Sequence, residues 1–308
     1  MKASVTQTGF AKVIWMGEHA VVYGHPALAL PLKSASVEVT LDAHAQDYLS
    51  SPFYTGPIEH APVMFTPIQT LFFLLKEHFE SPPLAVTMTL NMPLAAGMGS
   101  SAAIAAALTR AFYVYFERPL ELPVLYEWIQ LSEALAHDKP SGVDATVITY
   151  EKPLSFMKGE ASHFLHFTKK GYLLVVDSGV KGRTKDAVNK IRLHSHTEQT
   201  QHLIQTLGTL SETFIDTLPS SSLREMGGLM SQAHQVLKAL GVSEPTLDKL
   251  CDLALAHGAL GAKLTGGGLG GCMLALVENE TDLTALKKTF QNAGFSTLWT
   301  LDLERDFK

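Results

Sequence analysis

A segment rich in glycine, serine and alanine, from Pro93 to Ala103, joins two stretches of opposite character. The alternating apolar residues of 84–90 before it are typical of a β-strand, and residues 102–116 after it favour a helix. Glycines inside the segment allow a sharp turn and leave backbone N–H groups uncovered. A helix that starts on bare amides attracts anions, above all phosphate. The segment therefore predicts either a phosphate-binding loop or an ordinary turn in which Ser100 and Ser101 supply hydroxyls as N-caps do.

The same segment does not match the two common nucleotide-binding loops. Residues 97–102 satisfy the pattern G-x-G-x-x-G/A, but the dinucleotide fold needs an acidic residue at the end of a second strand about 20 positions later. One long helical stretch, ending near Pro119, occupies that region instead. The sequence contains no G-x-x-x-x-G-K-[ST], which excludes a Walker P-loop.

Composition narrows the class of protein. The chain has 308 residues, 46% of them hydrophobic and 18% charged, with a formal net charge of −6. This length allows one large or two ordinary domains. The mild acidity and the lack of a lysine or arginine run argue against a nucleic-acid binder. Cys251 and Cys272 make no disulfide framework, and we find no secretory or membrane-spanning segment. We expect a cytoplasmic protein with small-molecule partners, without nucleic acid or membrane.

The order of the expected elements favours an α+β fold in two domains, 1–160 and 161–308, because strands and helices mix without strict βαβ alternation. Strands are expected at 5–15, 36–41, 84–91, 145–150, 172–177, 262–264, 272–277 and 296–302. Helices are expected at 68–79, 102–116, 122–136, 185–207, 209–217, 223–240, 246–257 and 282–292. Residues 152–170 are expected to link the two halves.

A second glycine cluster lies late in the chain, with five glycines among residues 266–271. Such a cluster is entropically costly unless a close backbone approach is needed. It is either a long hairpin connection or, together with the first loop, part of a site that holds a ligand between domains. The 13 histidines, by contrast, mostly lack metal-ligand spacing, and neither H-E-x-x-H nor C-x-x-C occurs.

Four positions carry side chains suited to phosphoryl transfer. Lys12 shares the apolar face of the first strand, where a lysine either reaches an edge or is buried with a partner. Glu18 lies in the turn that follows, Glu133 lies near the end of an apolar helix, and Asp144 follows a turn at 140–143. Each alone is more often structural. Together with two glycine loops they supply the cation, carboxylates and anion-binding loops of a Mg²⁺-dependent phosphoryl transferase.

These residues resemble the GHMP kinase superfamily and, within it, the mevalonate kinases. Three motifs match in order: Lys12 with residues 17–27, then residues 93–103, then residues 263–272. Segments 140–144, 177–184 and 240–243 are similar as well. The chain departs from the family at Ala95, where glycine is frequent, and at 267–271, where Leu269 adds a side chain to a loop that is often Ala-Gly-Gly-Gly-Gly.

The resemblance implies a ribosomal-protein-S5-domain-2-like N-terminal domain, a ferredoxin-like C-terminal domain, and ATP and substrate in a cleft. It implies transfer of the ATP γ-phosphoryl group to the C5 hydroxyl of mevalonate, giving 5-phosphomevalonate for isoprenoid synthesis. By this resemblance the ATP phosphates are held by Pro93, Ala96, Gly97, Met98, Gly99, Ser100, Ser101 and Ala102.

The resemblance also implies the remaining roles. Mg²⁺ would be bound by Glu133 and a serine hydroxyl, with Ser101 preferred over Ser100. Asp144 would accept or orient the hydroxyl proton, and Lys12 would pair with Asp144 and the transferring phosphoryl group. The substrate would be bound by Glu18, His19 and Thr184, with His19 as a hydrogen-bond donor. The candidates to bind the mevalonate carboxylate are Lys12, His19 and Arg183.

Other functions stay open at this point. A phosphomevalonate kinase or a sugar kinase would need extra cationic residues or a hydroxyl-binding set near Glu18 and His19. Mevalonate diphosphate decarboxylase also uses ATP but releases CO₂. A regulatory nucleotide-binding protein with an inactive site is disfavoured, because Lys12, Glu133 and Asp144 occur together. Besides a monomer, we consider a homodimer as the form of the protein in solution.

Overall fold

The computed structural model describes residues 2–94, 96–136, 141–166 and 169–307. Ala95 and the first residue of the 140–144 segment, Pro140, lie outside this part of the chain. Two compact units form, each from segments that are distant in sequence: unit 1 comprises residues 1–11, 35–94 and 99–151, and unit 2 comprises residues 12–34, 95–98 and 152–308. The division at residues 160 and 161 stays a prediction.

Unit 1 is a sheet covered by helices on one face. Its strands are β1 (Ser4–Met16, which continues into unit 2), β2 (Ala27–Ala43, whose first part belongs to unit 2), β3 (Tyr48–Ser51), β4 (Tyr54–Pro57) and β5 (Leu84–Leu90). The strand order is β4-β3-β5-β2, with β1 also paired to β2; β3 and β5 run parallel, whereas the β2–β5 and β3–β4 pairs are antiparallel. Along β5 the buried Leu84, Val86 and Met88 alternate with more exposed residues, as expected when one sheet face is covered.

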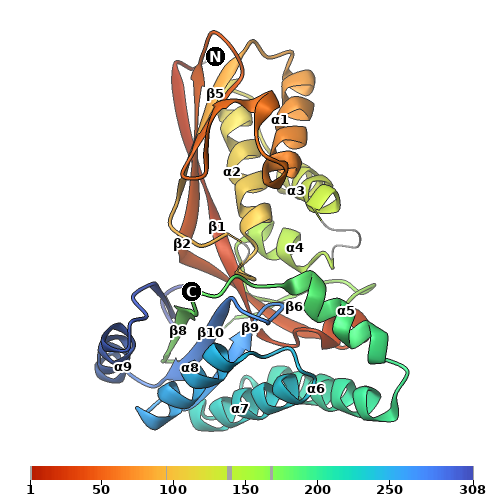
Figure 1. Cartoon of the computed structure of the whole chain (residues 1–308), viewed down its shortest axis with the longest axis vertical. Coiled ribbons are helices and arrows are strands. Elements are labelled where there is room, and N and C mark those ends of the chain that lie inside the picture. Colours follow the sequence, from red (N-terminus) through yellow and green to blue (C-terminus); the bar gives the residue numbers. More distant parts are fainter. Residues whose placement is uncertain (1, 95, 137–140, 167–168, 308) are drawn as a thin grey trace. The chain divides into compact units, whose positions relative to one another are not determined.

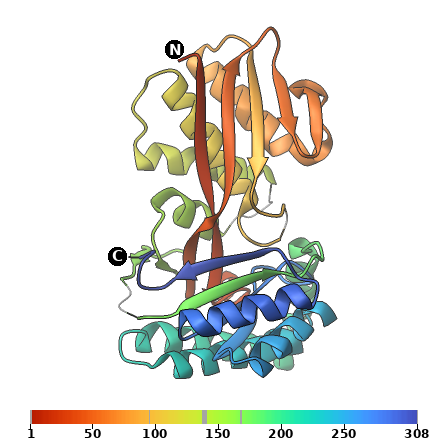
Figure 2. The ribbon, with the colours of Figure 1, turned by 90° about the vertical axis from the view of Figure 1, so that its left-hand side faces the viewer.

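The covering helices are α1 (Thr66–Phe79), α2 (Ser100–Tyr115) and α3 (Leu122–Ala136), with α4 (Val143–Tyr150) packed against α2 and α3. Figure 1 shows α1, α2 and α3 on the same side of the strands, and Figure 2 shows the strands from their other side. The backbone of β1 approaches α2 so closely that a Cβ at Gly9 would lie 1.9 Å from the Ala103 oxygen. Small residues on both elements are therefore required, which explains the alanine-rich start of α2.

Unit 2 contains a four-stranded antiparallel sheet. Its strands are β8 (Tyr172–Asp177), β9 (Gly261–Thr265), β10 (Cys272–Val277) and β11 (Leu298–Asp302), in the order β11-β8-β10-β9. The helices are α5 (Thr184–His194), α6 (Glu198–Thr217), α7 (Leu223–Ala239), α8 (Pro245–Ala256) and α9 (Glu280–Asn292). Helices α7, α8 and α9 pack on the sheet, and α6 packs on α7 (Figure 2). The spatial order 4-1-3-2 is that of a ferredoxin-like domain, which confirms the α+β fold class.

Two further short strands, β6 (Leu154–Phe156) and β7 (His163–Phe164), extend the part of β2 that lies in unit 2. The 3₁₀ turns are η1 (Ala20–Tyr23), η2 (Ile58–His60) and η3 (Val63–Phe65). The predicted link at 152–170 thus contributes strands of its own, and the sequence patterns missed β3 and β4.

Two predicted elements were wrong. Residues 145–150 form helix α4 and not a strand, because the β-branched residues that suggested a strand are buried against α2 and α3. The helical stretch 185–217 is interrupted at 195–197 and not at Gly208. Thr197 caps the second helix by accepting from the Thr200 amide, whereas Gly208 lies inside that helix. A glycine is needed there because a Cβ would lie 2.2 Å from His25 Nδ1.

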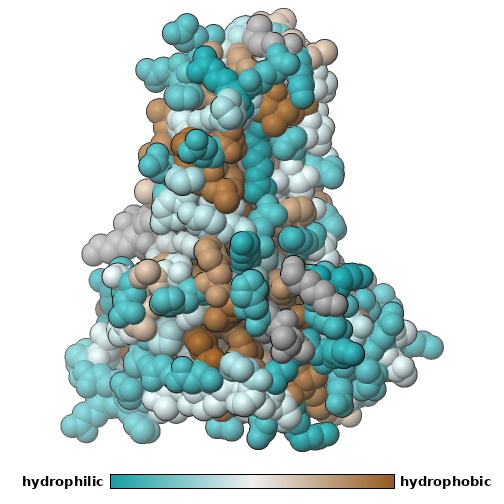
Figure 3. Space-filling view, turned by 180° about the vertical axis from the view of Figure 1, so that it is seen from behind, coloured by the Kyte–Doolittle hydropathy of each residue, from teal (hydrophilic) through white to brown (hydrophobic). Residues whose placement is uncertain are grey.

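The surface is mostly polar. On the face shown in Figure 3, hydrophilic residues surround smaller hydrophobic areas. Val63 in η3 and Leu193 in α5 are the most exposed large apolar side chains of the described residues, at 87% and 65%. Within the same part of the chain, no helix combines the length and apolar character needed to cross a bilayer.

Candidate active site

The first glycine loop leads directly into α2. Gly99 is the N-cap residue of α2, with a left-handed backbone (φ 71°), and no side chain caps the first turn. Ser100 and Ser101 therefore lie inside the helix and are not its caps, contrary to the alternative of an ordinary capped turn. The amides of the first turn remain without intrahelical partners at the positive end of a 16-residue helix. This arrangement suits an anionic group such as phosphate.

Not every predicted loop residue can contact a ligand in the same way. Ala102 is fully buried in α2, and Met98 is fully buried with its Sδ atom 3.5 Å from Cys272 Sγ. Ala96 is buried as well, whereas Pro93 and Gly97 are partly exposed. Buried side chains such as those of Met98 and Ala102 leave only backbone atoms for a phosphate.

Ser101 and Glu133 form one polar pair inside unit 1. The Ser101 hydroxyl donates to Glu133 Oε1 across a distance of 2.5 Å, and Glu133 is 4% exposed. Their helices α2 and α3 pack side by side, which brings together residues 32 positions apart. Mg²⁺ takes few protein oxygens and keeps several waters, so a hydroxyl and a carboxylate in the region where α2 begins fit its chemistry. Elsewhere, the described residues contain no group of three or more His, Cys, Asp or Glu placed to hold a metal.

Glu133→Gln and Ser101→Ala are each expected to raise the Mg²⁺ concentration for half-maximal rate by about tenfold or more, because each weakens an oxygen ligand. Glu127→Gln, on an exposed position of α3, is the matched control and should leave the Mg²⁺ curve unchanged. Titration of free Mg²⁺ at saturating substrates measures the effect. Curves that overlay the parent would place the metal elsewhere, and a shift in Ser100→Ala alone would reverse the assignment within the serine pair.

Asp144 lies in the first turn of α4, directly after Val143, which begins the helix. Gly142 is the N-cap, with φ 89°, and this left-handed turn allows the chain to enter the helix. Asp144 is partly buried, and its carboxylate belongs to the helix end where negative charge is stabilised. The structure therefore presents this carboxylate at a helix start and not, as predicted, at the start of a strand.

In unit 2 the two glycine loops touch. Gly97 and Gly266 both have φ 78°, and a Cβ at Gly266 would lie 2.8 Å from the Gly97 oxygen. The Lys12 side chain, 3% exposed, donates to the same Gly97 oxygen at 3.1 Å, and the Lys12 amide donates to the Met98 oxygen. Lys12 is thus buried with a partner, and its ammonium group lies at the turn that precedes α2.

The second glycine cluster connects the antiparallel strands β9 and β10, so it is a hairpin connection. Its backbone is nevertheless surrounded by predicted site residues. A Cβ at Gly267 would lie 2.4 Å from the Thr184 hydroxyl, and the Gly267 oxygen lies 2.9 Å from His19 Nε2. Thr184, at the start of α5, and His19 therefore meet at the same glycine. The Arg183 side chain is largely exposed, and its guanidinium group lies 3.9 Å from the Asp186 carboxylate.

His19 is neutral and its tautomer is set by its partner. A carbonyl oxygen can only accept, so Nε2 carries the proton and donates to Gly267. Burial lowers the pKa of His19 to about 4, because the charged ring would lose its water. The predicted role of His19 as a hydrogen-bond donor to the substrate stays a prediction; in this structure Nε2 donates to the Gly267 oxygen, and the remaining ring nitrogen, Nδ1, is an acceptor.

Replacing His19 is expected to make the free energy of unfolding depend less on pH below about pH 6.5. Between about pH 6.5 and 4 the unfolded chain protonates this histidine while the folded chain does not, so stability falls on acidification, by up to about 3 kcal/mol. His19→Asn removes this contribution and keeps a polar side chain. Urea unfolding at pH 7 and pH 4.5 compares the two proteins. An equal loss in both would contradict a buried neutral His19.

Glu18 has a partner that the sequence motifs did not identify. Its carboxylate Oε1 accepts from the Lys263 ammonium group, and both side chains are almost fully buried, at 1% and 0% exposure. Burial raises the pKa of Glu18, an effect that the charge of Lys263 opposes. Lys263 lies in the otherwise apolar strand β9, 245 positions from Glu18. The sequence feature that could have identified Lys263 is a lysine in a strand beside a glycine loop, the same feature that singled out Lys12.

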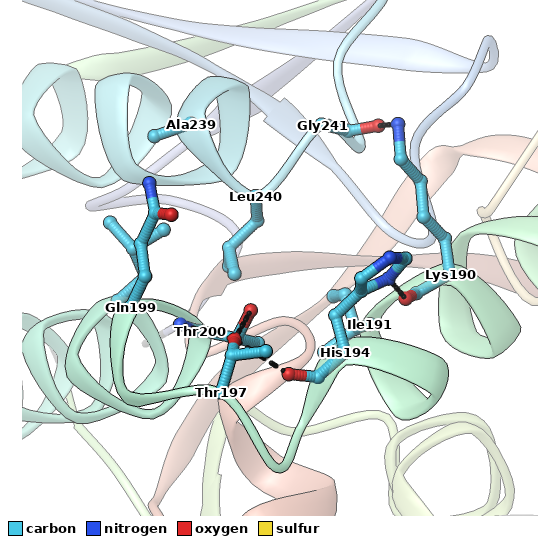
Figure 4. A pocket seen from close by; sticks show the side chains of 10 residues that line it. Lys190, Ile191, His194, Thr197, Gln199, Thr200, Ala239, Leu240 and Gly241 are labelled. Carbon is cyan, nitrogen blue, oxygen red and sulfur yellow. Dashed lines mark hydrogen bonds between the residues drawn. The ribbon is translucent and has the colours of Figure 1, made fainter.

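Figure 4 shows a separate cavity of about 340 Å³ in unit 2. It lies where the end of α5, the start of α6 and the end of α7 meet, and the Lys190 amine closes one side by donating to the Gly241 oxygen at 2.8 Å. None of the site residues predicted from the sequence lines it.

Comparisons with known proteins agree with these motifs. The GHMP kinases N terminal domain matches residues 67–152, and the GHMP kinases C terminal domain matches residues 214–295. A mevalonate kinase of Pyrococcus abyssi is 31% identical over 293 residues, 86% of each chain, and one of Aeropyrum pernix is 28% identical over 90% of this chain and 89% of its own. The crystal structure of L. major mevalonate kinase in complex with R-mevalonate has the same fold, with a TM-score of 0.81 at 24% identity over 98% of both chains. With both domains present in order and such similarity along most of its length, the chain belongs to the GHMP kinases and, among them, to the mevalonate kinase family.

Proposed function

We propose that this chain transfers the γ-phosphoryl group of ATP to the C5 hydroxyl of mevalonate, forming 5-phosphomevalonate for isoprenoid synthesis. The observation that carries the proposal is the uncapped first turn of α2, whose residue Ser101 is paired with Glu133. Phosphoryl transfer requires a site for the phosphates and oxygen ligands for Mg²⁺, and a helix start suited to anions, a hydroxyl and a carboxylate would supply them. The named relatives support mevalonate as the acceptor.

Each residue then has a defined task. The backbone of residues 97–101 would hold the ATP phosphates, and Ser101 and Glu133 would hold Mg²⁺, which offsets phosphate charge when bound. Asp144 would accept the C5 hydroxyl proton while the C5 oxygen bonds to the γ-phosphorus and the bond to the β-phosphate oxygen breaks, releasing ADP. Lys12 would offset the charge that develops on the transferring group.

The acceptor would be bound by residues of unit 2. Since the His19 ring is neutral and its Nε2 is engaged, His19 would accept a hydrogen bond from a substrate hydroxyl through Nδ1. Thr184, on the other side of Gly267, can donate or accept. Of the three candidates for the mevalonate carboxylate, we favour the basic side chains of Lys12 and Arg183. We also propose a cytoplasmic location, which the two free, buried cysteines support.

An ADP-release assay across several alcohols tests the function. Purified protein with Mg²⁺ and ATP is expected to phosphorylate mevalonate much faster than galactose, homoserine or phosphomevalonate, because a site built around polar partners rejects acceptors that leave those partners unpaired. Faster turnover of phosphomevalonate, or CO₂ release from mevalonate diphosphate, would overturn the substrate assignment and leave the family membership intact.

A further inference from the structure

The buried ion pair of Glu18 and Lys263 lies next to the substrate-side residue His19. The Lys263 ammonium group donates to Glu18 Oε1 and, at 2.7 Å, to the Leu264 oxygen. The second carboxylate oxygen, Glu18 Oε2, is buried and has no hydrogen-bond partner among the described residues. A fully buried pair with one unsatisfied oxygen is an unusual element for the interior of unit 2.

Stability does not explain why the chain keeps this pair. Removing two charges from water is costly, and their attraction offsets this cost only when the other polar atoms are also satisfied. The unpaired Oε2 atom adds a further desolvation penalty. Apolar residues of similar volume would serve a purely structural core at least as well.

The backbone beside the pair is strained. His19 has φ 63° and ψ −46°, outside the regions that non-glycine residues prefer. Such a conformation persists only where the surrounding structure over-determines it, and it concentrates at functional sites. Here His19 is held from two directions: its ring donates to the Gly267 oxygen at 2.9 Å, and the backbone carbonyl oxygen of Glu18 accepts from the Ala20 amide at 2.8 Å.

We propose that Lys263 is a positioning residue: by holding the Glu18 carboxylate in the interior, it keeps His19 in its strained conformation with Nδ1 directed to accept a hydroxyl of the acceptor substrate. Lys12 is a second cation that acts on Glu18, but its ammonium group is committed to the Gly97 oxygen, so the direct contact comes from Lys263. The substrate part of this inference rests on the proposed function. The link from Lys263 to His19 does not.

Lys263→Met tests the proposal, because methionine keeps the length and removes the charge. The KM for mevalonate is expected to rise roughly 10- to 100-fold, because a small misplacement of a binding group causes a loss of this size. The KM for ATP is expected to change less than about twofold. Lys76→Met is the matched control: it breaks the Lys76–Asp47 ion pair of unit 1, at 2.5 Å, and should leave both KM values unchanged. An unchanged mevalonate KM in Lys263→Met, or an equal rise in both KM values, would overturn the proposal.

A double variant keeps the test valid if Lys263→Met alone does not fold. Glu18→Gln combined with Lys263→Met leaves no buried charge, so its unfolding free energy should recover towards that of the parent. Its KM for mevalonate is expected to stay raised. If the KM for mevalonate and the stability both returned to the parent values, Lys263 would serve only to balance the buried charge of Glu18. That result would contradict a positioning role.

A spectroscopic measurement separates this inference from the proposed function. In ¹⁵N-histidine spectra the parent should show His19 as a single Nε2–H tautomer, and Lys263→Met should show a mixture of tautomers as the ring leaves the Gly267 oxygen. A parent that does not phosphorylate mevalonate would refute the function while these spectra still test the link. An unchanged single tautomer in Lys263→Met would refute the link itself.

Discussion

Asp144→Asn is expected to lower kcat by roughly 10²–10⁴, the range for loss of a positioned acid–base group. Asparagine keeps the size of the side chain and the helix start, but it cannot accept the hydroxyl proton. The fold and the ATP affinity should persist, because Asp144 lies in the first turn of the short helix α4, away from the start of α2 in sequence. Steady-state rates and nucleotide titration of the same preparation measure both quantities.

The matched control for this variant is Asp216→Asn, on an exposed position of α6. It removes the same charge from the protein and should leave kcat within about twofold of the parent, as expected for surface substitutions. Near-parental turnover in Asp144→Asn would remove Asp144 from the mechanism. A loss of ATP binding there would instead indicate a structural role for the α4 turn.

Lys12→Met is expected to lower kcat by roughly 10²–10³, the cost of removing one preorganised group that offsets transition-state charge. Methionine retains the aliphatic stem in its buried position on β1, so the packing of the strand is largely kept. The lost interactions include the ammonium charge and its bond to the Gly97 oxygen. The ratio of kcat/KM between parent and variant gives the loss of transition-state stabilisation.

Lys33→Met, an exposed lysine of β2, controls for the change in net charge and should have parental kinetics. Lys12→Arg adds a second comparison, because arginine keeps the charge but not the compact shape of the ammonium group. If Lys12→Met changed only the KM for ATP, Lys12 would be a ground-state binding residue and not one that acts on the transferring group.

Much of the fold was predictable because local patterns agree with tertiary structure there. The alternation of 84–90, the helical stretch after the glycine loop and the apolar strand 172–177 all appear where expected. The α4 segment failed for the opposite reason. Its Val, Ile and Thr residues read as a strand, but burial between helices stabilises a helix in spite of their propensities.

The parts of the site that lie close in sequence could be identified from the sequence, and those that depend on distant pairing could not. Gly97, Gly99 and the serines after them predict a helix start suited to anions, because glycine conformation and helix polarity are local properties. The resemblance pointed to Glu133, but only the packing of α2 on α3 places it beside Ser101.

By itself, then, the sequence determined the class of fold and the kinase family, and it predicted the phosphate loop, since these rest on residue patterns within short segments. Only the tertiary structure decided that Lys263 pairs with Glu18, that His19 has a strained backbone, and that its neutral ring donates to the Gly267 oxygen through Nε2, which leaves Nδ1 as an acceptor. The physical reason is that burial and long-range pairing set charge and tautomer, and both arise only when β9 and the turn after β1 come together in the folded unit.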